Sequence, residues 1–188
     1  SRAYVHKIRG QVDGIVVGIN TVLRDDPLLT CRLEGGRNPR RIIIDSNAFL
    51  PLRSRILNTI HESEIIVAVN KNAQQGRIEK LEQLGCTIIQ TRDKSDRVDL
   101  KDLFRKLGKM KLTNILVEGG SKVITSIIEE RLADKVIVFI APIIIGGEEA
   151  QSPILGKGVD TVDKAMKINE ITVKSFSHDI AIEGILEC

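Results

Sequence analysis

Short apolar runs alternate with amphipathic segments along most of this chain. The runs are rich in Ile and Val and predict buried strands at residues 14–18, 41–45, 64–69, 86–90, 114–118 and 134–141. Helical spacing of apolar positions predicts helices at residues 3–9, 73–84, 99–107 and 122–132. Successive strand–helix units indicate an α/β fold of three layers, with a mostly parallel central sheet and helices on both faces.

The last part of the chain has a different pattern. Residues 168–176 and 180–187 predict two strands around a polar turn, which we expect to form an antiparallel hairpin added at an edge of the sheet. Such an edge exposes unpaired backbone groups unless something covers it. A second copy of the chain is the simplest cover, so we expect a homodimer. The alternative is an edge protected by its own charges, Lys174, Asp179 and Glu183.

Length and composition indicate one globular domain over residues 1–188. No apolar run approaches the roughly 20 residues of a membrane span, and no signal peptide is visible, so we expect no membrane partner. The chain opens inside a predicted helix without an initiator Met, which suggests that residues upstream are missing. The three cysteines, Cys31, Cys86 and Cys188, are far apart and form no CxxC pair, which favours a reducing cytoplasm.

Charge and histidine spacing exclude some functions. The net charge of +3 suits an anionic small molecule, and the basic groups 37–41 and 106–111 lack the interleaved aromatics of a single-strand binder. We therefore expect the side chains of these groups, Arg41 included, to lie at the solvated surface. We also expect no nucleic-acid partner. His6, His61 and His178 match no metal spacing, so no metal site is predicted and each is interpreted as a surface or cap residue.

Polar residues directly after a buried strand mark the first candidate site. Thr21 and Asp25 follow the strand at 14–18 and lie one helical turn apart, before Pro27 stops the helix. In open α/β sheets ligands bind beyond the carboxyl ends of strands. We therefore expect both side chains to face a ligand.

A second candidate begins with Glu118 at the end of a predicted strand. Gly119, Gly120 and Ser121 follow it and open a helix, where exposed N–H groups and the helix dipole favour phosphate. A plain strand–helix turn uses the same residues about as often, so the glycines alone are a weak signal. Farther on, Pro142 interrupts the apolar run at 140–147 and indicates a kink or sheet edge.

Four segments, 12–30, 39–46, 115–120 and 140–147, resemble the successive motifs of the riboflavin-biosynthesis pyrimidine reductases. The resemblance implies a dihydrofolate-reductase-like fold that uses NADPH to reduce a phosphorylated ribosylaminopyrimidine to its ribitylamino product. It assigns the substrate to Arg9, Leu29, Arg32 and Glu118. It assigns the cofactor to Thr21, Asp25, Asp45, Ser46, Gly119, Gly120 and Ser121. The family's N-terminal strand is absent, so we expect residues 1–188 to be one reductase domain without it.

The implied roles agree with the chemistry of the side chains. Arg9 and Arg32 have planar forks that can bind a 5′-phosphate, although a solvated role suits either arginine alone. Glu118 can orient ribose hydroxyls or, as a second possibility, help move a proton. No deaminase-like Cys/His cluster is present, which favours 2,5-diamino-6-ribosylamino-4(3H)-pyrimidinone 5′-phosphate as substrate. The alternatives are the deaminated uracil, another pyridine-nucleotide reductase of the same fold such as a dihydrofolate reductase, and a non-catalytic nucleotide-binding domain.

Overall fold

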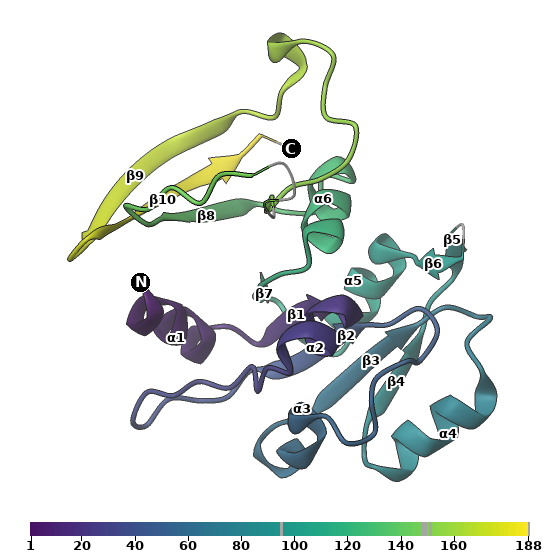
Figure 1. Ribbon diagram of the computed structural model, residues 1–188. Coiled ribbons are helices and arrows are strands. Elements are labelled where there is room, and N and C mark those ends of the chain that lie inside the picture. Colours follow the sequence, from purple (N-terminus) through teal and green to yellow (C-terminus); the bar gives the residue numbers. More distant parts are fainter. Residues whose placement is uncertain (95, 148–149, 151, 188) are drawn as a thin grey trace.

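The computed structural model describes residues 1–94, 96–147, 150 and 152–187, so Cys188 lies outside the described residues. Its central sheet has five parallel strands in the order β4-β3-β2-β1-β7 (Figure 1). The strands are β1 (Gly14–Gly18), β2 (Arg40–Ile44), β3 (Ile65–Val69), β4 (Thr87–Gln90) and β7 (Ile115–Val117). The prediction of a parallel α/β sheet is confirmed.

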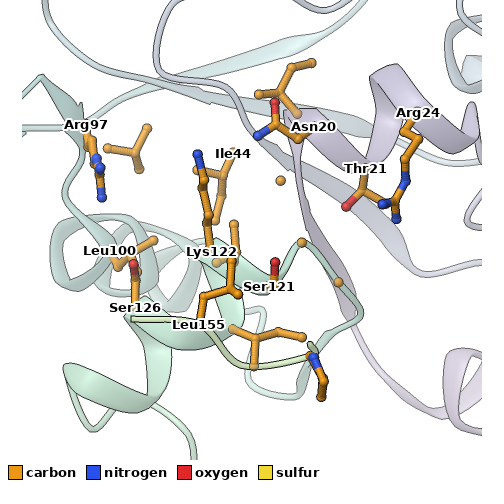
Figure 2. Close-up of a pocket in the computed structure, with 18 of the residues that line it drawn as sticks. Asn20, Thr21, Arg24, Ile44, Arg97, Leu100, Ser121, Lys122, Ser126 and Leu155 are labelled. Carbon is orange, nitrogen blue, oxygen red and sulfur yellow. The ribbon is translucent and has the colours of Figure 1, made fainter. Parts of the chain in front are cut away.

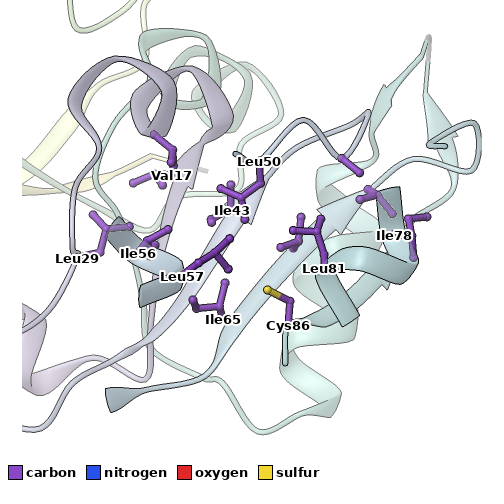
Figure 3. Packing of buried hydrophobic residues seen from close by; sticks show 14 of the residues in the cluster. Val17, Leu29, Ile43, Leu50, Ile56, Leu57, Ile65, Ile78, Leu81 and Cys86 are labelled. Atoms are coloured by element: carbon purple, nitrogen blue, oxygen red, sulfur yellow. The ribbon is translucent and has the colours of Figure 1, made fainter. Parts of the chain in front are cut away.

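Apolar side chains cover both faces of the central sheet, so β1 and β3 are buried along their whole length. On one face, Ile15, Val17 and Ile43 pack with residues of α3 (Arg55–Asn58) and α4 (Gln75–Gln83) (Figure 3). On the other face, Val16 and Ile42 pack with residues of α5 (Leu100–Lys109) and α6 (Ser121–Glu129). A strand buried on both faces requires a continuous apolar run, and the sequence has one at each of these strands.

The C-terminal hairpin is antiparallel as predicted, but its predicted place at an edge of the central sheet is wrong. Strands β9 (Ile168–Phe176) and β10 (Asp179–Leu186) join β8 (Lys135–Ile140) in a separate three-stranded sheet of order β8-β10-β9 (Figure 1). In this arrangement β10 pairs on both sides, so its backbone groups are satisfied without the central sheet.

Helix α1 (Arg2–Gln11) packs against the second sheet. Its Tyr4 ring stacks on Phe176 at 5.0 Å between centroids, and the Tyr4 hydroxyl donates to Glu183 of β10. Glu183 also accepts from Lys174 at 2.8 Å and Lys135 at 2.9 Å. The bond from Lys174, followed by those from Tyr4 and Lys135, lowers the pKa of Glu183 to about 2.

Arg41 corrects the prediction that the basic group at 37–41 is solvated. Its side chain is fully buried and makes no ion pair with any described residue. The guanidinium instead donates to the carbonyls of Leu28, Ile56, Thr59 and Ser63 and to the hydroxyls of Thr59 and Ser63. A planar group with five N–H donors can remain charged in the core when every donor is satisfied, and here it fixes the loops that flank β2.

Several short elements have no predicted counterpart: the 3₁₀ turns η1 (Ile60–Glu62) and η2 (Val162–Lys164), and a small hairpin of β5 (Asp93–Lys94) and β6 (Arg97–Val98). Helix α2 (Ile19–Asp25) follows β1 and ends two residues before Pro27, as predicted. No helix among the described residues has the length and apolar character that crossing a bilayer requires.

Candidate functional site

A cavity of about 970 Å³ opens where β1, β2 and β7 end. Its walls include Gly18 at the end of β1, Ile44 and Ser46 at and after the end of β2, and Gly119 after β7 (Figure 2). Residues of α2, β6, α5 and α6 and the segment at 152–155 also line it. The cavity therefore lies at the carboxyl edge of the parallel sheet, where such folds bind ligands, and its volume suits a large cofactor.

The turn between β7 and α6 requires glycine. Gly119 and Gly120 have φ values of +133° and +77°, which residues other than glycine rarely adopt. A Cβ on Gly120 would lie 3.3 Å from Oγ1 of Thr21 and 3.6 Å from the backbone nitrogen of Gly18. The turn thus presses its backbone against Thr21 and leaves main-chain groups at the cavity wall.

The cavity is positively charged. Arg24, Arg97 and Lys122 line it, and no Asp or Glu is among the described lining residues. Of these three cations, only Arg24 pairs with an acidic side chain of the described residues, because its Nε donates to Oδ1 of Asp25 at 3.0 Å. Backbone N–H groups at the start of α6 add to this field. The lining therefore favours an anionic ligand such as a phosphate-bearing cofactor.

A largely buried ion pair lies beside the cavity. Arg9 of α1 donates from Nε to Oε1 of Glu118 at 2.8 Å and from Nη2 to Oε2, and its Nη1 reaches the carbonyl of Thr30 at 3.2 Å. The Arg9 and Glu118 side chains are only 15% and 19% exposed. Since Glu118 directly precedes Gly119, this pair borders the glycine turn. Arg9 has a protein acceptor on each of its three nitrogens, so its fork is not free for a phosphate.

His6 and Arg32 lie close to this pair. The backbone N–H of Arg32 donates to Nδ1 of His6 at 3.3 Å, which ties the loop after residue 30 to α1. Burial, followed by the cations of Arg9 and Arg32, lowers the pKa of His6. The interpretation of His6 as a surface or cap residue missed this link. The Arg32 side chain is exposed and makes no hydrogen bond or ion pair with another described residue, so it is available to a ligand.

The structure distributes the predicted site residues unevenly. Thr21, Ser46 and the Gly119–Gly120–Ser121 turn come together in the cavity wall, and their role toward a cofactor stays a prediction. Asp25 lies outside the lining and pairs with Arg24. Asp45 is 1% exposed, accepts from the N–H of Leu50 at 2.7 Å, and has its pKa raised by burial.

Leu29 and the cations of the cavity also depart from the sequence-based interpretation. Leu29 is buried in the core with φ +57°, and its role toward the substrate stays a prediction. Arg97 and Lys122 are lining residues that the sequence pattern does not mark. Lys122 follows the glycine turn directly and could be found from that position, whereas Arg97 belongs to a two-residue strand with no sequence signal.

The chain is similar over nearly its whole length to proteins of riboflavin biosynthesis. The family model described as RibD C-terminal domain matches residues 1–182. The 2,5-diamino-6-ribosylamino-4(3H)-pyrimidinone 5′-phosphate reductase of Methanothermobacter thermautotrophicus is 36% identical over 182 residues, 95% of this chain and 82% of that protein. The riboflavin biosynthesis protein RibD of Actinobacillus pleuropneumoniae is 34% identical over 99% of this chain, which spans only 49% of that protein.

A solved structure resembles the fold over the same range. Acinetobacter baumannii RibD superposes with a TM-score of 0.83 at 23% identity, covering 99% of this chain and 50% of that one. At this identity the likeness supports the fold alone. It includes both sheets, since nearly the whole chain is aligned.

Proposed function

Because this chain belongs to the RibD C-terminal domain family, we propose that it reduces the ribosyl group of 2,5-diamino-6-ribosylamino-4(3H)-pyrimidinone 5′-phosphate to the ribitylamino product, with NADPH as hydride donor. The observation that carries the proposal is a cationic, glycine-walled cavity that borders the Arg9–Glu118 pair. The cavity suits a dinucleotide, and the region around the ion pair offers polar groups to a sugar phosphate.

The cavity residues fit the cofactor. Gly119 and Gly120 allow a pyrophosphate to approach the backbone, and Ser121, which opens α6, lines the cavity. Thr21 packs against the same turn, which directly follows Glu118, so it can contact the nicotinamide portion. The pyridine nucleotide supplies the hydride when bound, so no protein nucleophile is required.

The region around the ion pair suits the substrate. Arg32 has a free guanidinium that can bind the 5′-phosphate through two parallel hydrogen bonds. Glu118 keeps both oxygens on Arg9 and therefore presents a fixed carboxylate edge that can orient ribose hydroxyls. Arg9 acts through Glu118 as a positioning residue. Holding the reacting carbon in place accounts for much of the rate in such reactions.

Exclusion of water is the other task of the chain during hydride transfer. The backbone N–H of Leu155 donates to Oγ1 of Thr125 at 2.7 Å, which fastens the segment at 152–155 along α6 and beside the cavity. Leu155 and Pro153 contribute apolar surface there. Thr125→Val deletes this contact. It should raise the KM for the cofactor and cause only a small loss of unfolding free energy.

The choice of pyrimidine can be tested directly. We propose the diamino substrate because the reductase of Methanothermobacter thermautotrophicus, named for it, matches 95% of this chain. The experiment mixes equal concentrations of the diamino compound and its deaminated uracil with NADPH and follows both products by mass spectrometry. Faster consumption of the diamino compound supports the proposal, and preference for the uracil overturns it.

We also propose a homodimer that uses the second sheet. Strand β9 is an edge strand that is exposed over most of its length, and its Ile171 and Val173 side chains are 58% and 63% exposed. A symmetric pair would cover the same apolar strip on both copies. Sedimentation at micromolar concentration should give twice the chain mass, and Val173→Lys should halve it. A wild-type mass of 20.8 kDa would contradict the dimer.

A further inference from the structure

The two ends of the cavity have different chemistry. Thr21 lies at one end, whereas Arg97 and Leu100 lie at the other (Figure 2). The glycine turn packs against Thr21, and Glu118 directly precedes that turn in the sequence. Hydride transfer requires the nicotinamide beside the substrate, so the adenosine of a bound dinucleotide must extend toward Arg97. This orientation rests on the proposed function.

The adenosine end holds a cation without an acidic partner. The Arg97 side chain is exposed, lines the cavity and makes no ion pair with any residue in the described part of the chain. Lys122, at the start of α6, lines the cavity between Arg97 and the glycine turn (Figure 2). The lining thus places two cations, and no carboxylate, where the adenosine ribose would lie. This arrangement favours a cofactor that carries an extra phosphate on that ribose.

The backbone that carries Arg97 is anchored to the sheet. The N–H of Val98 donates to Oγ of Ser46 at 3.2 Å, and the N–H of Asn70 donates to the carbonyl of Ser46 at 3.1 Å. The Asn70 side chain donates to the carbonyl of Asp96 at 2.9 Å. Because Oγ of Ser46 already accepts one hydrogen bond, its own O–H can donate into the cavity beside Arg97.

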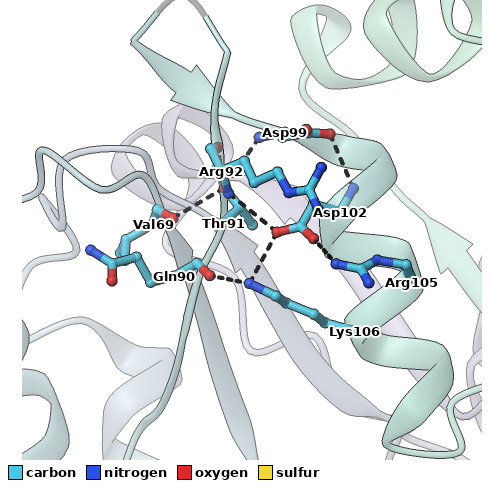
Figure 4. Close-up of polar contacts among 8 residues, drawn as sticks. All are labelled: Val69, Gln90, Thr91, Arg92, Asp99, Asp102, Arg105 and Lys106. Carbon is cyan, nitrogen blue, oxygen red and sulfur yellow. Dashed lines mark hydrogen bonds and ion pairs between the residues drawn. The ribbon is translucent and has the colours of Figure 1, made fainter.

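The two ends of this hairpin are fixed as well. The N–H of Arg92 donates to Oδ2 of Asp102 at 3.2 Å, and the N–H of Asp99 donates to Oγ1 of Thr91 at 3.2 Å (Figure 4). Asp102 is itself buried and held by Arg105 and Lys106, and these contacts keep its pKa below the usual range. Arg97 therefore extends from a hairpin whose backbone is fixed by hydrogen bonds. Less conformational entropy is lost when its side chain binds a ligand.

The position of Asp45 also favours a cofactor with a 2′-phosphate. A carboxylate just after a strand commonly binds the 2′-hydroxyl of an unphosphorylated cofactor and repels a 2′-phosphate. Here Asp45 directly follows β2 but is 1% exposed and accepts from the N–H of Leu50, so it does not line the cavity. The next residue, Ser46, takes the place at the wall with a neutral donor.

We infer that Arg97, assisted by Lys122 and Ser46, binds the 2′-phosphate of the cofactor and makes this chain select NADPH over NADH. The guanidinium offers two parallel N–H donors to phosphate oxygens, which an unphosphorylated ribose lacks. Selectivity is thus set by the β5–β6 hairpin rather than by the glycine turn, which meets groups that both cofactors share.

The test compares kcat/KM for NADPH and NADH in the wild type and in Arg97→Gln. Loss of one charge-assisted contact should lower kcat/KM for NADPH by about 10- to 100-fold and change the value for NADH by less than about twofold. Arg92→Gln is the matched control, since it removes the same charge from the base of the hairpin outside the cavity lining. It should leave both values near those of the wild type.

Calorimetry with adenosine 2′,5′-bisphosphate and adenosine 5′-monophosphate separates this inference from the proposed reaction. The wild type should bind the bisphosphate more tightly, and Arg97→Gln should remove most of the difference. Equal losses for both cofactors, or an unchanged NADPH preference in Arg97→Gln, would overturn the inference while leaving the reductase intact. If no pyrimidine is turned over, the proposed function fails, and the two adenosine ligands still decide the role of Arg97.

Discussion

Substitution of Gly120 by Ala tests the proposed contact between the glycine turn and the cofactor phosphates. At φ +77°, a side chain costs about 1–2 kcal/mol of folding free energy. The new Cβ would also lie 3.3 Å from Oγ1 of Thr21, so Thr21 must shift slightly. The same methyl group occupies the wall where a phosphate would approach, and we expect the Kd for NADP⁺ to rise by about tenfold or more, equivalent to about 1.4 kcal/mol.

Gly35→Ala is the matched control for this change. Gly35 has a similar φ of +70°, but a Cβ there would meet no heavy atom within 4 Å beyond its chain neighbours, and the residue is not part of the cavity lining. Urea denaturation should show a loss of stability in both variants, and calorimetry should show weaker NADP⁺ binding in Gly120→Ala alone. Unchanged affinity in a folded Gly120→Ala protein would refute the assignment of the turn to the phosphates.

Three further predictions concern the substrate side and the support of α1. Arg32→Ala should lower kcat/KM by about one to two orders of magnitude on the phosphorylated substrate and change it little on a dephosphorylated analogue; equal losses on both would assign Arg32 to the loop. Arg9→Met and Glu118→Gln should each cost about 1–3 kcal/mol in urea unfolding, less than a fully buried pair because both side chains retain some exposure. The double variant should cost less than the sum, and additive losses would argue against coupling. Glu183 has its pKa lowered from 4.5 to about 2, so its contribution to stability is complete above about pH 4.5 and lost as the pH falls to about 2. The stability difference between wild type and Glu183→Gln should shrink over that range, and a constant difference would show that the contacts of Glu183 with Lys174, Tyr4 and Lys135 do not stabilise the fold.

The central sheet can be predicted because its strands obey a simple rule. The sequence predicts β1 at residues 14–18 and β3 within one residue, since strands covered on both faces need unbroken apolar runs. Apolar spacing predicts helix α5 with Asp99 near its start, and the Asp99 side chain accepts from the N–H of Asp102 as an N-cap. Local chemistry is sufficient for these elements.

Tertiary contacts decide what the sequence does not reveal. Arg41 is charged and lies in a basic group, yet loop carbonyls from distant segments satisfy it in the core. Asp45 has the position of a cofactor-binding residue, but its carboxylate is buried and accepts a hydrogen bond from the backbone N–H of Leu50. Arg97 reaches the cavity only because the hairpin folds back onto Ser46. In each case the partner is separated from the residue by a turn or a whole element, so no periodic pattern marks it.

Consumption of NADPH by the purified chain is the most direct test of the proposed reaction. The oxidation of NADPH should be followed with 2,5-diamino-6-ribosylamino-4(3H)-pyrimidinone 5′-phosphate, with its deaminated uracil and with dihydrofolate in separate reactions. We expect turnover with the diamino compound, accompanied by a product heavier by two hydrogens, and none with dihydrofolate. Turnover of dihydrofolate, or NADPH oxidation with none of the three compounds, would contradict the account.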